Sequence, residues 1–144
     1  EQGGFVFYTN IESPKARDLA RRPAAALTVY WEPLRRQVRI QGRVEPVPAA
    51  EADVYFASRP RESQLAAWAS QQSEPLASRE VLENRLAARD RQYEGKPVPR
   101  PPFWGGYRLV PDRIEFWQEQ PHRLHDRFLY TREGELWNVV RLYP

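Results

Sequence analysis

The sequence predicts an α+β fold, in which helices cover an antiparallel β-sheet or barrel. Three observations support this fold class: strand patterns lie at both ends of the 144-residue chain, helical patterns lie between them, and short turns join neighbouring strands. The regular alternation of strand and helix that is typical of a parallel sheet is missing. A chain of this length is most simply one domain, so we expect residues 1–144 to fold as a single unit.

The first third of the chain predicts three strands and one helix. Residues 13–23 predict the helix, because Ser13 is a suitable N-cap and the proline that follows it is favoured at the first helical position. The strands are predicted by two apolar runs and one alternating stretch, at 3–10, 24–31 and 37–47.

The middle of the chain predicts three helices, at 48–59, 60–70 and 78–95. The second helix starts anew at Pro60, because proline lacks the N–H that a helix interior needs but suits a first turn. Ser78 is a suitable N-cap for the third helix.

The last third of the chain returns to strands. Residues 106–118 predict two strands around a turn at Pro111-Asp112, since a proline removes a hydrogen bond from a β-ladder. The closing stretch predicts a hairpin whose turn is Glu133-Gly134.

The stretch HRLHDRFLY, residues 122–130, precedes this hairpin turn and is predicted to be a strand. Arg123, His125 and Arg127 then share one face of it. Three side chains that can carry positive charge repel one another unless an anionic or strongly polar group lies in front of them. Two interpretations are open: a ligand-binding face, or a solvated edge strand whose charges oppose aggregation.

Tyr55, Arg59 and Ser63 are spaced four residues apart around the predicted helix start at Pro60. A helix N-terminus favours an anion, because its free N–H groups and its dipole are positive. A guanidinium and two hydroxyls are the donors that a phosphate monoester needs. The alternative is that Tyr55 lies in the core, Arg59 is solvated and Ser63 is an ordinary first-turn residue.

The composition argues against several classes of partner. The net charge is +3, but acidic residues are interspersed and no block of Lys or Arg occurs, so we expect small anionic ligands rather than nucleic acid. No apolar run approaches the roughly 20 residues that span a bilayer, so no membrane association is expected. The chain has no cysteine, and a strand would place His122 and His125 on opposite faces, so no metal site is expected. A cysteine-free chain also fits the reducing cytoplasm.

Six stretches together resemble the pyridoxine/pyridoxamine 5′-phosphate oxidase family, in the same order and with comparable spacing: FVFYTN, RQVRIQGRVE, YFASRPRESQLAAWAS, FWGGYRL, IEFWQ and HRLHDRFLY. The resemblance implies an antiparallel split β-barrel, a homodimer, and flavin mononucleotide (FMN) bound at the subunit interface. It also implies the reaction, which is the oxidation of pyridoxine 5′-phosphate or pyridoxamine 5′-phosphate to pyridoxal 5′-phosphate. O2 is the electron acceptor, and H2O2 is produced.

The resemblance further implies roles for individual residues. Arg123 and His125 match catalytic residues that hold the pyridoxyl ring of the substrate against the flavin. The family's clasp for the substrate phosphate is matched by three residues around Pro60, namely Tyr55, Arg59 and Ser63. The residues that match flavin contacts are Tyr8, Thr9, Lys15, Gln37, Gln72, Ser73, Trp117 and Arg127.

The chain departs from the family pattern at two places. Pro14 stands where the family usually has an arginine that contacts the flavin phosphate. The family's preceding strand, with an Arg-x-x-x-x-Lys segment, would lie before Glu1, so we expect an N-terminal segment to be missing. Two other functions are alternatives to the oxidase: a related flavin oxidase of another pathway, such as phenazine biosynthesis, and a non-catalytic protein that binds FMN or pyridoxal phosphate. The phosphate clasp argues against the first, because an unphosphorylated substrate does not need it.

Overall fold

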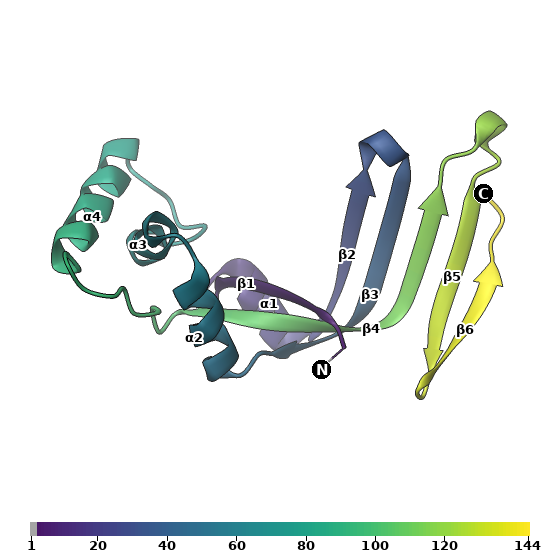
Figure 1. The fold of residues 1–144 in the computed structure, drawn as a ribbon, viewed down its shortest axis with the longest axis horizontal. Helices are drawn as coiled ribbons and strands as arrows, with labels where there is room; N and C mark the ends of the chain where they lie inside the picture. Colours follow the sequence, from purple (N-terminus) through teal and green to yellow (C-terminus); the bar gives the residue numbers. More distant parts are fainter. Residues whose placement is uncertain (1–2) are drawn as a thin grey trace. The chain divides into compact units, whose positions relative to one another are not determined.

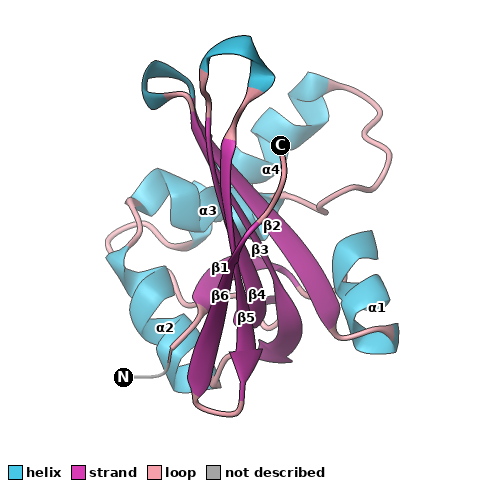
Figure 2. Ribbon diagram, turned by 90° about the vertical axis from the view of Figure 1, so that its right-hand side faces the viewer, coloured by secondary structure: helices cyan, strands magenta, loops and turns pink. Residues whose placement is uncertain are grey.

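The computed structural model describes residues 3–144, which form two compact units whose elements are labelled in Figure 1. The sheet unit contains the residues up to Val6, together with Arg22–Glu45 and Arg108–Pro144, and the helical unit contains Phe7–Arg21 and Pro46–Tyr107. All α-helices of the described chain belong to the helical unit, whereas the sheet unit consists of strands and two short helical turns (Figure 2). The expectation that 1–144 form one domain stays a prediction.

The helical unit confirms all four predicted helices. Each helix ends within a few residues of the predicted boundaries. As predicted, the hydroxyl of Ser78 caps the last helix by accepting a hydrogen bond from the backbone N–H of Val81, at 3.4 Å. The observed helices are α1 (Pro14–Arg21), α2 (Ala49–Ser58), α3 (Arg61–Ala69) and α4 (Arg79–Gln92).

The core of the helical unit is built around Trp104. Phe56, Leu65, Val98 and Trp104 are buried together, and the rings of Phe56 and Trp104 meet edge to face at a centroid distance of 5.1 Å. Burial of such side chains contributes on the order of 2 kcal/mol each. Tyr8 packs against this cluster, so the core fixes the end of the first strand next to α2.

The strands of the described chain form one antiparallel sheet in the order β2-β3-β4-β5-β6, and β1 (Phe5–Asn10) pairs with β4. Gly42 of β3 faces the backbone of Val110 in β4 so closely that a Cβ atom would have no room. This close approach explains a glycine inside a strand. The other strands are β2 (Ala24–Trp31), β3 (Arg36–Pro46), β4 (Trp104–Gln118), β5 (Asp126–Glu133) and β6 (Leu136–Arg141).

The predicted turn at Pro111-Asp112 is wrong, because β4 runs through it as one strand (Figure 1). On one side of Pro111, Leu109 lies next to Gly4, at the start of β1. On the other side, the pairing with β5 begins at Arg113. Pro111 therefore lies where β4 changes neighbours, and a residue without an N–H interrupts neither ladder there.

The predicted strand at 122–130 is wrong in its first half. Pro121–Arg123 form a short helical turn, in which His122 has a φ of 58° and Arg123 a φ of 63°. β5 begins only at Asp126. Arg123 and His125 therefore lie outside the strand, and the predicted common face with Arg127 is not formed.

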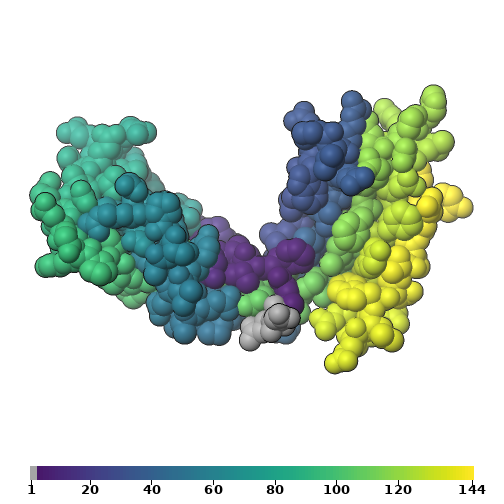
Figure 3. Space-filling view, viewed as in Figure 1, coloured from purple at the N-terminus to yellow at the C-terminus, as the bar shows by residue number. Residues whose placement is uncertain are grey.

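The closing hairpin is confirmed. β5 and β6 pair from Phe128 with Arg141 to Glu133 with Leu136, and Gly134 has the positive φ of 63° that a tight turn needs. In Figure 3 this hairpin and the C-terminal residues appear in yellow-green and yellow on the surface of the sheet unit. No helix within the described residues has the length and apolar character that a membrane crossing requires.

Candidate functional site

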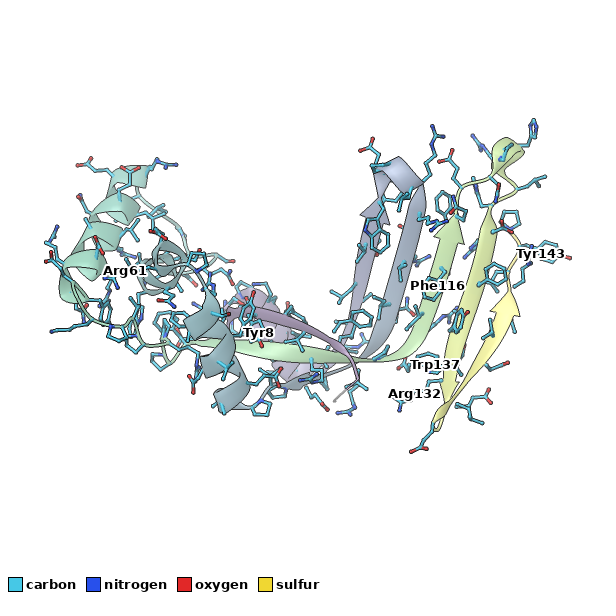
Figure 4. The ribbon with its side chains drawn as sticks, in the orientation of Figure 1. Tyr8, Arg61, Phe116, Arg132, Trp137 and Tyr143 are labelled. Atoms are coloured by element: carbon cyan, nitrogen blue, oxygen red, sulfur yellow. The ribbon has the colours of Figure 1, made fainter. Side chains whose placement is uncertain are left out.

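A cavity of about 340 Å³ opens in the helical unit, where β1, α2 and α3 meet. Figure 4 labels Tyr8 on β1, one of the residues that line this cavity. The three residues predicted to bind the substrate phosphate also line it: Tyr55, Arg59 and Ser63. The structure therefore brings the predicted clasp together on one cavity wall.

Arg59 and Ser63 lie on either side of the chain reversal at Pro60. Arg59 ends α2 in an extended conformation, Pro60 caps α3, and Ser63 lies in the first turn of α3. This arrangement confirms the prediction that both residues flank a helix N-terminus.

The guanidinium of Arg59 is held by aromatic rings rather than by an acid. Its central carbon lies 5.1 Å from the ring centroid of Trp104 and 5.7 Å from that of Phe56. Its Nη1 is buried and has no hydrogen-bond partner among the residues that the structure describes. The alternative that Arg59 is merely solvated is therefore wrong.

Tyr55 is 45% exposed, so the alternative that it is a core residue is also wrong. Its ring stacks on that of Tyr8 with 4.0 Å between the centroids, and the ring of Tyr8 lies parallel to that of Trp104 at 5.3 Å. This stack leaves Tyr55 little freedom to turn.

A polar cluster lies beside this cavity in the same unit. The Lys15 ammonium donates to Thr9 Oγ1 and to Gln72 Oε1, both at 2.7 Å, and the Thr9 hydroxyl donates to Gln72 Oε1 at 2.9 Å. A weaker bond of 3.4 Å joins Lys15 to Ser13 Oγ. Within residues 3–144, the oxygens that accept hydrogen bonds from Lys15 all belong to uncharged side chains, so its positive charge is available to an anion. Ser73 lies in an exposed turn nearby in sequence, with a φ of 70°.

The remaining predicted residues lie in the sheet unit, where alternation places three of them on one face. Trp117 of β4 is paired directly with Arg127 of β5. Glu115 lies two residues before Trp117, so it shares this face. Its ion pairs with Arg39 of β3 and with Arg127 place both arginines on the same face. Gln37 lies two residues before Arg39 and shares the face for the same reason. We call these five residues the Glu115 face.

Glu115 is buried, and two arginines approach its carboxylate. Arg127 Nε donates to Oε1 at 2.8 Å, and Arg39 Nη1 lies 3.7 Å from Oε2. The hydrogen bond from Arg127 is the main cause that holds the pKa of Glu115 below its ordinary value of 4.5. Burial opposes this shift, and the charges of Arg127, Arg39 and Arg113 reinforce it. The same hydrogen bond raises the pKa of Arg127.

His125 lies beside the Glu115 face although it precedes the strand. Its ring centroid is 4.8 Å from that of Trp117, and its Nδ1 accepts a hydrogen bond of 3.2 Å from the backbone N–H of Gln120. In the neutral imidazole, this bond places the proton on Nε2. Arg123 belongs to the turn before it, in a left-handed conformation.

The sequence did not predict two residues that contact arginines of the candidate site. Trp104 supports Arg59 from the FWGG stretch, and Glu115 supports Arg127 from the IEFWQ stretch. Both stretches contribute to the family resemblance, but their spacing along the chain does not reveal which arginine each residue contacts. The sequence does hold one sign of a role for Glu115, because it lies two positions before Trp117, a predicted flavin contact.

Two family descriptions match the chain. "Pyridoxamine 5'-phosphate oxidase" matches residues 1–92, and "Pyridoxine 5'-phosphate oxidase C-terminal dimerisation region" matches residues 104–144.

The chain is also similar to curated proteins named pyridoxine/pyridoxamine 5′-phosphate oxidase. That of Rubrobacter xylanophilus is 58% identical over 144 residues, which are 100% of this chain and 66% of the relative. That of Myxococcus xanthus is 60% identical over 141 residues, which are 98% of this chain and 68% of the relative. The chain thus spans 66% and 68% of the lengths of these two relatives.

Solved structures share the fold. PhzG from Burkholderia lata, solved in complex with tetrahydrophenazine-1-carboxylic acid, matches with a TM-score of 0.91 and 35% identity over 98% of this chain and 69% of that one. A pyridoxamine 5′-phosphate oxidase-related, FMN-binding protein from Nostoc punctiforme matches with a TM-score of 0.76 and 17% identity over 96% of this chain and 72% of that one. These likenesses confirm the predicted α+β split-barrel fold class.

Proposed function

The chain belongs to the pyridoxamine 5′-phosphate oxidase family, and on this premise we propose that it is an FMN-dependent oxidase of pyridoxine 5′-phosphate and pyridoxamine 5′-phosphate. The alcohol substrate and O2 give pyridoxal 5′-phosphate and H2O2. The amine substrate also consumes one water and releases ammonia. This is a reaction of vitamin B6 metabolism.

The observation that carries the proposal is the buried Nη1 of Arg59, which lacks a partner among the described residues. Buried donors are almost always satisfied, so a donor left open on a cavity wall suits an acceptor brought by a ligand. Tyr55 and Ser63 line the same cavity. A phosphate monoester offers three acceptor oxygens to such a set of donors.

The residues present also fit FMN. In the helical unit, the oxygens of Thr9, Ser13 and Gln72 that accept from the Lys15 ammonium are uncharged, and an anionic phosphate would complete its environment. In the sheet unit, an amide, an indole and a guanidinium share one face, and these groups suit the polar edge and the plane of a flavin ring. We assign to FMN the eight residues Tyr8, Thr9, Lys15, Gln37, Gln72, Ser73, Trp117 and Arg127.

FMN held by these eight residues would supply the redox chemistry of the reaction. The protein groups position the substrate. We propose that Arg123 holds the pyridoxyl ring and offsets the negative charge that develops on it. His125 presents Nε2–H when it is neutral, because Nδ1 is occupied by the Gln120 N–H. We therefore assign to it a hydrogen bond donated to the substrate.

A turnover assay tests the proposal. The protein is loaded with FMN and supplied with pyridoxine 5′-phosphate, pyridoxamine 5′-phosphate or unphosphorylated pyridoxine, and both H2O2 and pyridoxal 5′-phosphate are measured. We expect turnover of the two phosphorylated substrates. Arg59→Ala should raise KM for them about ten- to a hundredfold, since a hydrogen bond to a charged group contributes roughly 1.5–3 kcal/mol. The Kd of FMN should stay unchanged.

Arg79→Ala is the matched control, because the Arg79 side chain is 89% exposed in α4 and its one partner among the described residues is its helix neighbour Glu83. Three results would contradict the proposal in different ways. FMN binding without turnover favours a non-catalytic binding protein. Turnover of a reduced phenazine precursor instead of the phosphorylated pyridoxines favours the phenazine alternative, the chemistry suggested by the PhzG complex. Equal loss of FMN and substrate binding in Arg59→Ala removes Arg59 from the phosphate site.

A further inference from the structure

An acidic side chain lies among residues assigned to an anionic cofactor. Glu115 is 8% exposed near the C-terminal end of β4, on the same face as Gln37, Trp117 and Arg127. An unpaired carboxylate there would lose its hydration on burial. The chain instead surrounds Glu115 with Arg39 and Arg127, so the carboxylate acts on these arginines rather than on a ligand.

The contacts of Arg127 show what Glu115 does. Arg127 Nε donates to Glu115 at 2.8 Å, and Nη1 donates to the backbone carbonyl of Tyr143 at 3.0 Å. The backbone N–H of Leu142 in turn donates to the Arg127 carbonyl at 2.9 Å. Tyr143 contributes its backbone only, since its side chain is 94% exposed and projects outward (Figure 4). Within residues 3–144, Nη2 is the guanidinium nitrogen of Arg127 that keeps no hydrogen-bond partner.

We propose that Glu115 is a positioning residue, which fixes the Arg127 guanidinium so that Nη2 is directed to FMN. The proposal rests on the proposed function, because it takes Arg127 to be a flavin contact. Arginine has several flexible torsions, and an arginine that is already oriented loses less side-chain freedom when the ligand binds. Glu115 thus strengthens FMN binding without touching FMN.

A double-mutant cycle tests this role. The Kd of FMN is measured by quenching of flavin fluorescence for the wild type, Glu115→Gln, Arg127→Leu and the double variant. Glu115→Gln should raise the Kd of FMN about tenfold. This is less than the full loss of a charged hydrogen bond would cause, because Glu115 acts through Arg127. In the Arg127→Leu background the same change should alter Kd by less than about twofold, because its target is gone. Glu115→Asp, which keeps the charge, should restore part of the affinity.

Glu119→Gln is the matched control, because it removes the same charge from an exposed ion pair with Arg35 in the same unit. Its FMN affinity should equal that of the wild type. Equal Kd values for the wild type and Glu115→Gln overturn the proposal, and so does an equal loss in both backgrounds, which indicates general packing or charge. If Glu115→Gln does not fold by circular dichroism, Glu115→Asp takes its place in the cycle. Failure of the wild type to bind FMN would overturn the proposed function and this inference with it.

Discussion

Arg59 and Arg127 are both held in place before any ligand arrives, but by different kinds of contact. Two aromatic rings lie under the guanidinium of Arg59, so its position does not depend on a salt bridge. Glu115 and a backbone carbonyl hold Arg127. Aromatic support leaves Arg59 without an ion pair among the described residues, which suits a dianionic phosphate. A carboxylate partner reduces the net charge at Arg127, which suits the edge of a ring.

The ionic contact of Glu115 makes stability depend on pH. The pKa of Glu115 in the folded protein is held below its ordinary value of 4.5, chiefly by the Arg127 hydrogen bond and also by the charges of Arg39 and Arg113. The stabilisation is therefore present above the ordinary value and is lost as the pH falls below it toward the folded pKa. At pH 7 Glu115→Gln should unfold with a free energy lower by roughly 1 kcal/mol.

Urea unfolding at neutral and at acid pH checks this expectation. The difference between the wild type and Glu115→Gln should shrink in acid, because protonation removes the ionic contact from the wild type as well. Glu119→Gln again serves as control, and its exposed pair should add little at either pH. A difference that stays constant or grows in acid would show that Glu115 does not stabilise the fold through its charge.

At the scale of elements, a helical turn and the strand after it separate two arginines that the sequence pattern placed together. Arg123 lies in the turn Pro121–Arg123 with a φ of 63°, whereas Arg127 lies in β5. Left-handed backbone at a residue other than glycine is costly and is often found at functional sites. Gln120 supports the segment after the turn, since its N–H donates to His125 and its side chain to Asp126.

Because the two arginines belong to different elements, their substitutions should have different effects. Arg123→Leu should keep FMN bound but slow the reduction of the flavin by saturating pyridoxine 5′-phosphate by about tenfold or more. Arg127→Leu should instead lose flavin on dilution and regain activity when excess FMN is added. Bound flavin and single-turnover reduction, measured on the same samples, separate the two phenotypes. Loss of flavin in both variants, or normal reaction in both, would show that the two arginines do not divide the work in this way.

At the scale of the whole molecule, an apolar sheet face remains exposed. Phe116 and Tyr130 pack edge to face on the side of the sheet opposite Glu115, with Val139 paired to Tyr130. Phe116 is 44% exposed and is labelled in Figure 4, and Val139 is 46% exposed. Trp31, Val38, Phe116 and Phe128 line a cavity of about 600 Å³ there. Such surfaces in a single chain mark interaction sites, and the matched dimerisation region 104–144 indicates a second copy as the partner.

We therefore predict a homodimer whose interface includes this apolar face. Light scattering on the FMN-loaded protein should give twice the chain mass of 16.9 kDa. Val139→Glu should shift the mass toward the monomer and lower the bound flavin, because a buried unpaired charge opposes association. Leu136→Glu is the control, since Leu136 is more exposed and lies on the opposite side of β6, at the end of the hairpin. A wild-type monomer that retains FMN, or equal effects of the two variants, contradicts the prediction.

Local sequence patterns were sufficient to predict the helices and most strands, whereas phosphate binding by Tyr55, Arg59 and Ser63 stays a prediction. Pro60 and Ser78 determine helix starts through contacts within one turn, and Gly134 determines a hairpin turn through its own φ. Arg59 and Ser63 were correctly placed at a helix N-terminus for the same reason: the features that place them lie within a few residues along the chain.

Where strands continue, where they stop and which charges meet depends on contacts between distant parts of the chain. β4 passes through Pro111 because its neighbours change there, which no pattern within β4 reveals. Arg123 leaves the strand because Pro121–Arg123 form a turn, although alternation alone favoured a strand. Glu115 meets Arg39 and Arg127 because three strands lie side by side in one register. Partners on different strands are far apart in sequence, so their meeting depends on the pairing of whole strands, which local propensity does not determine.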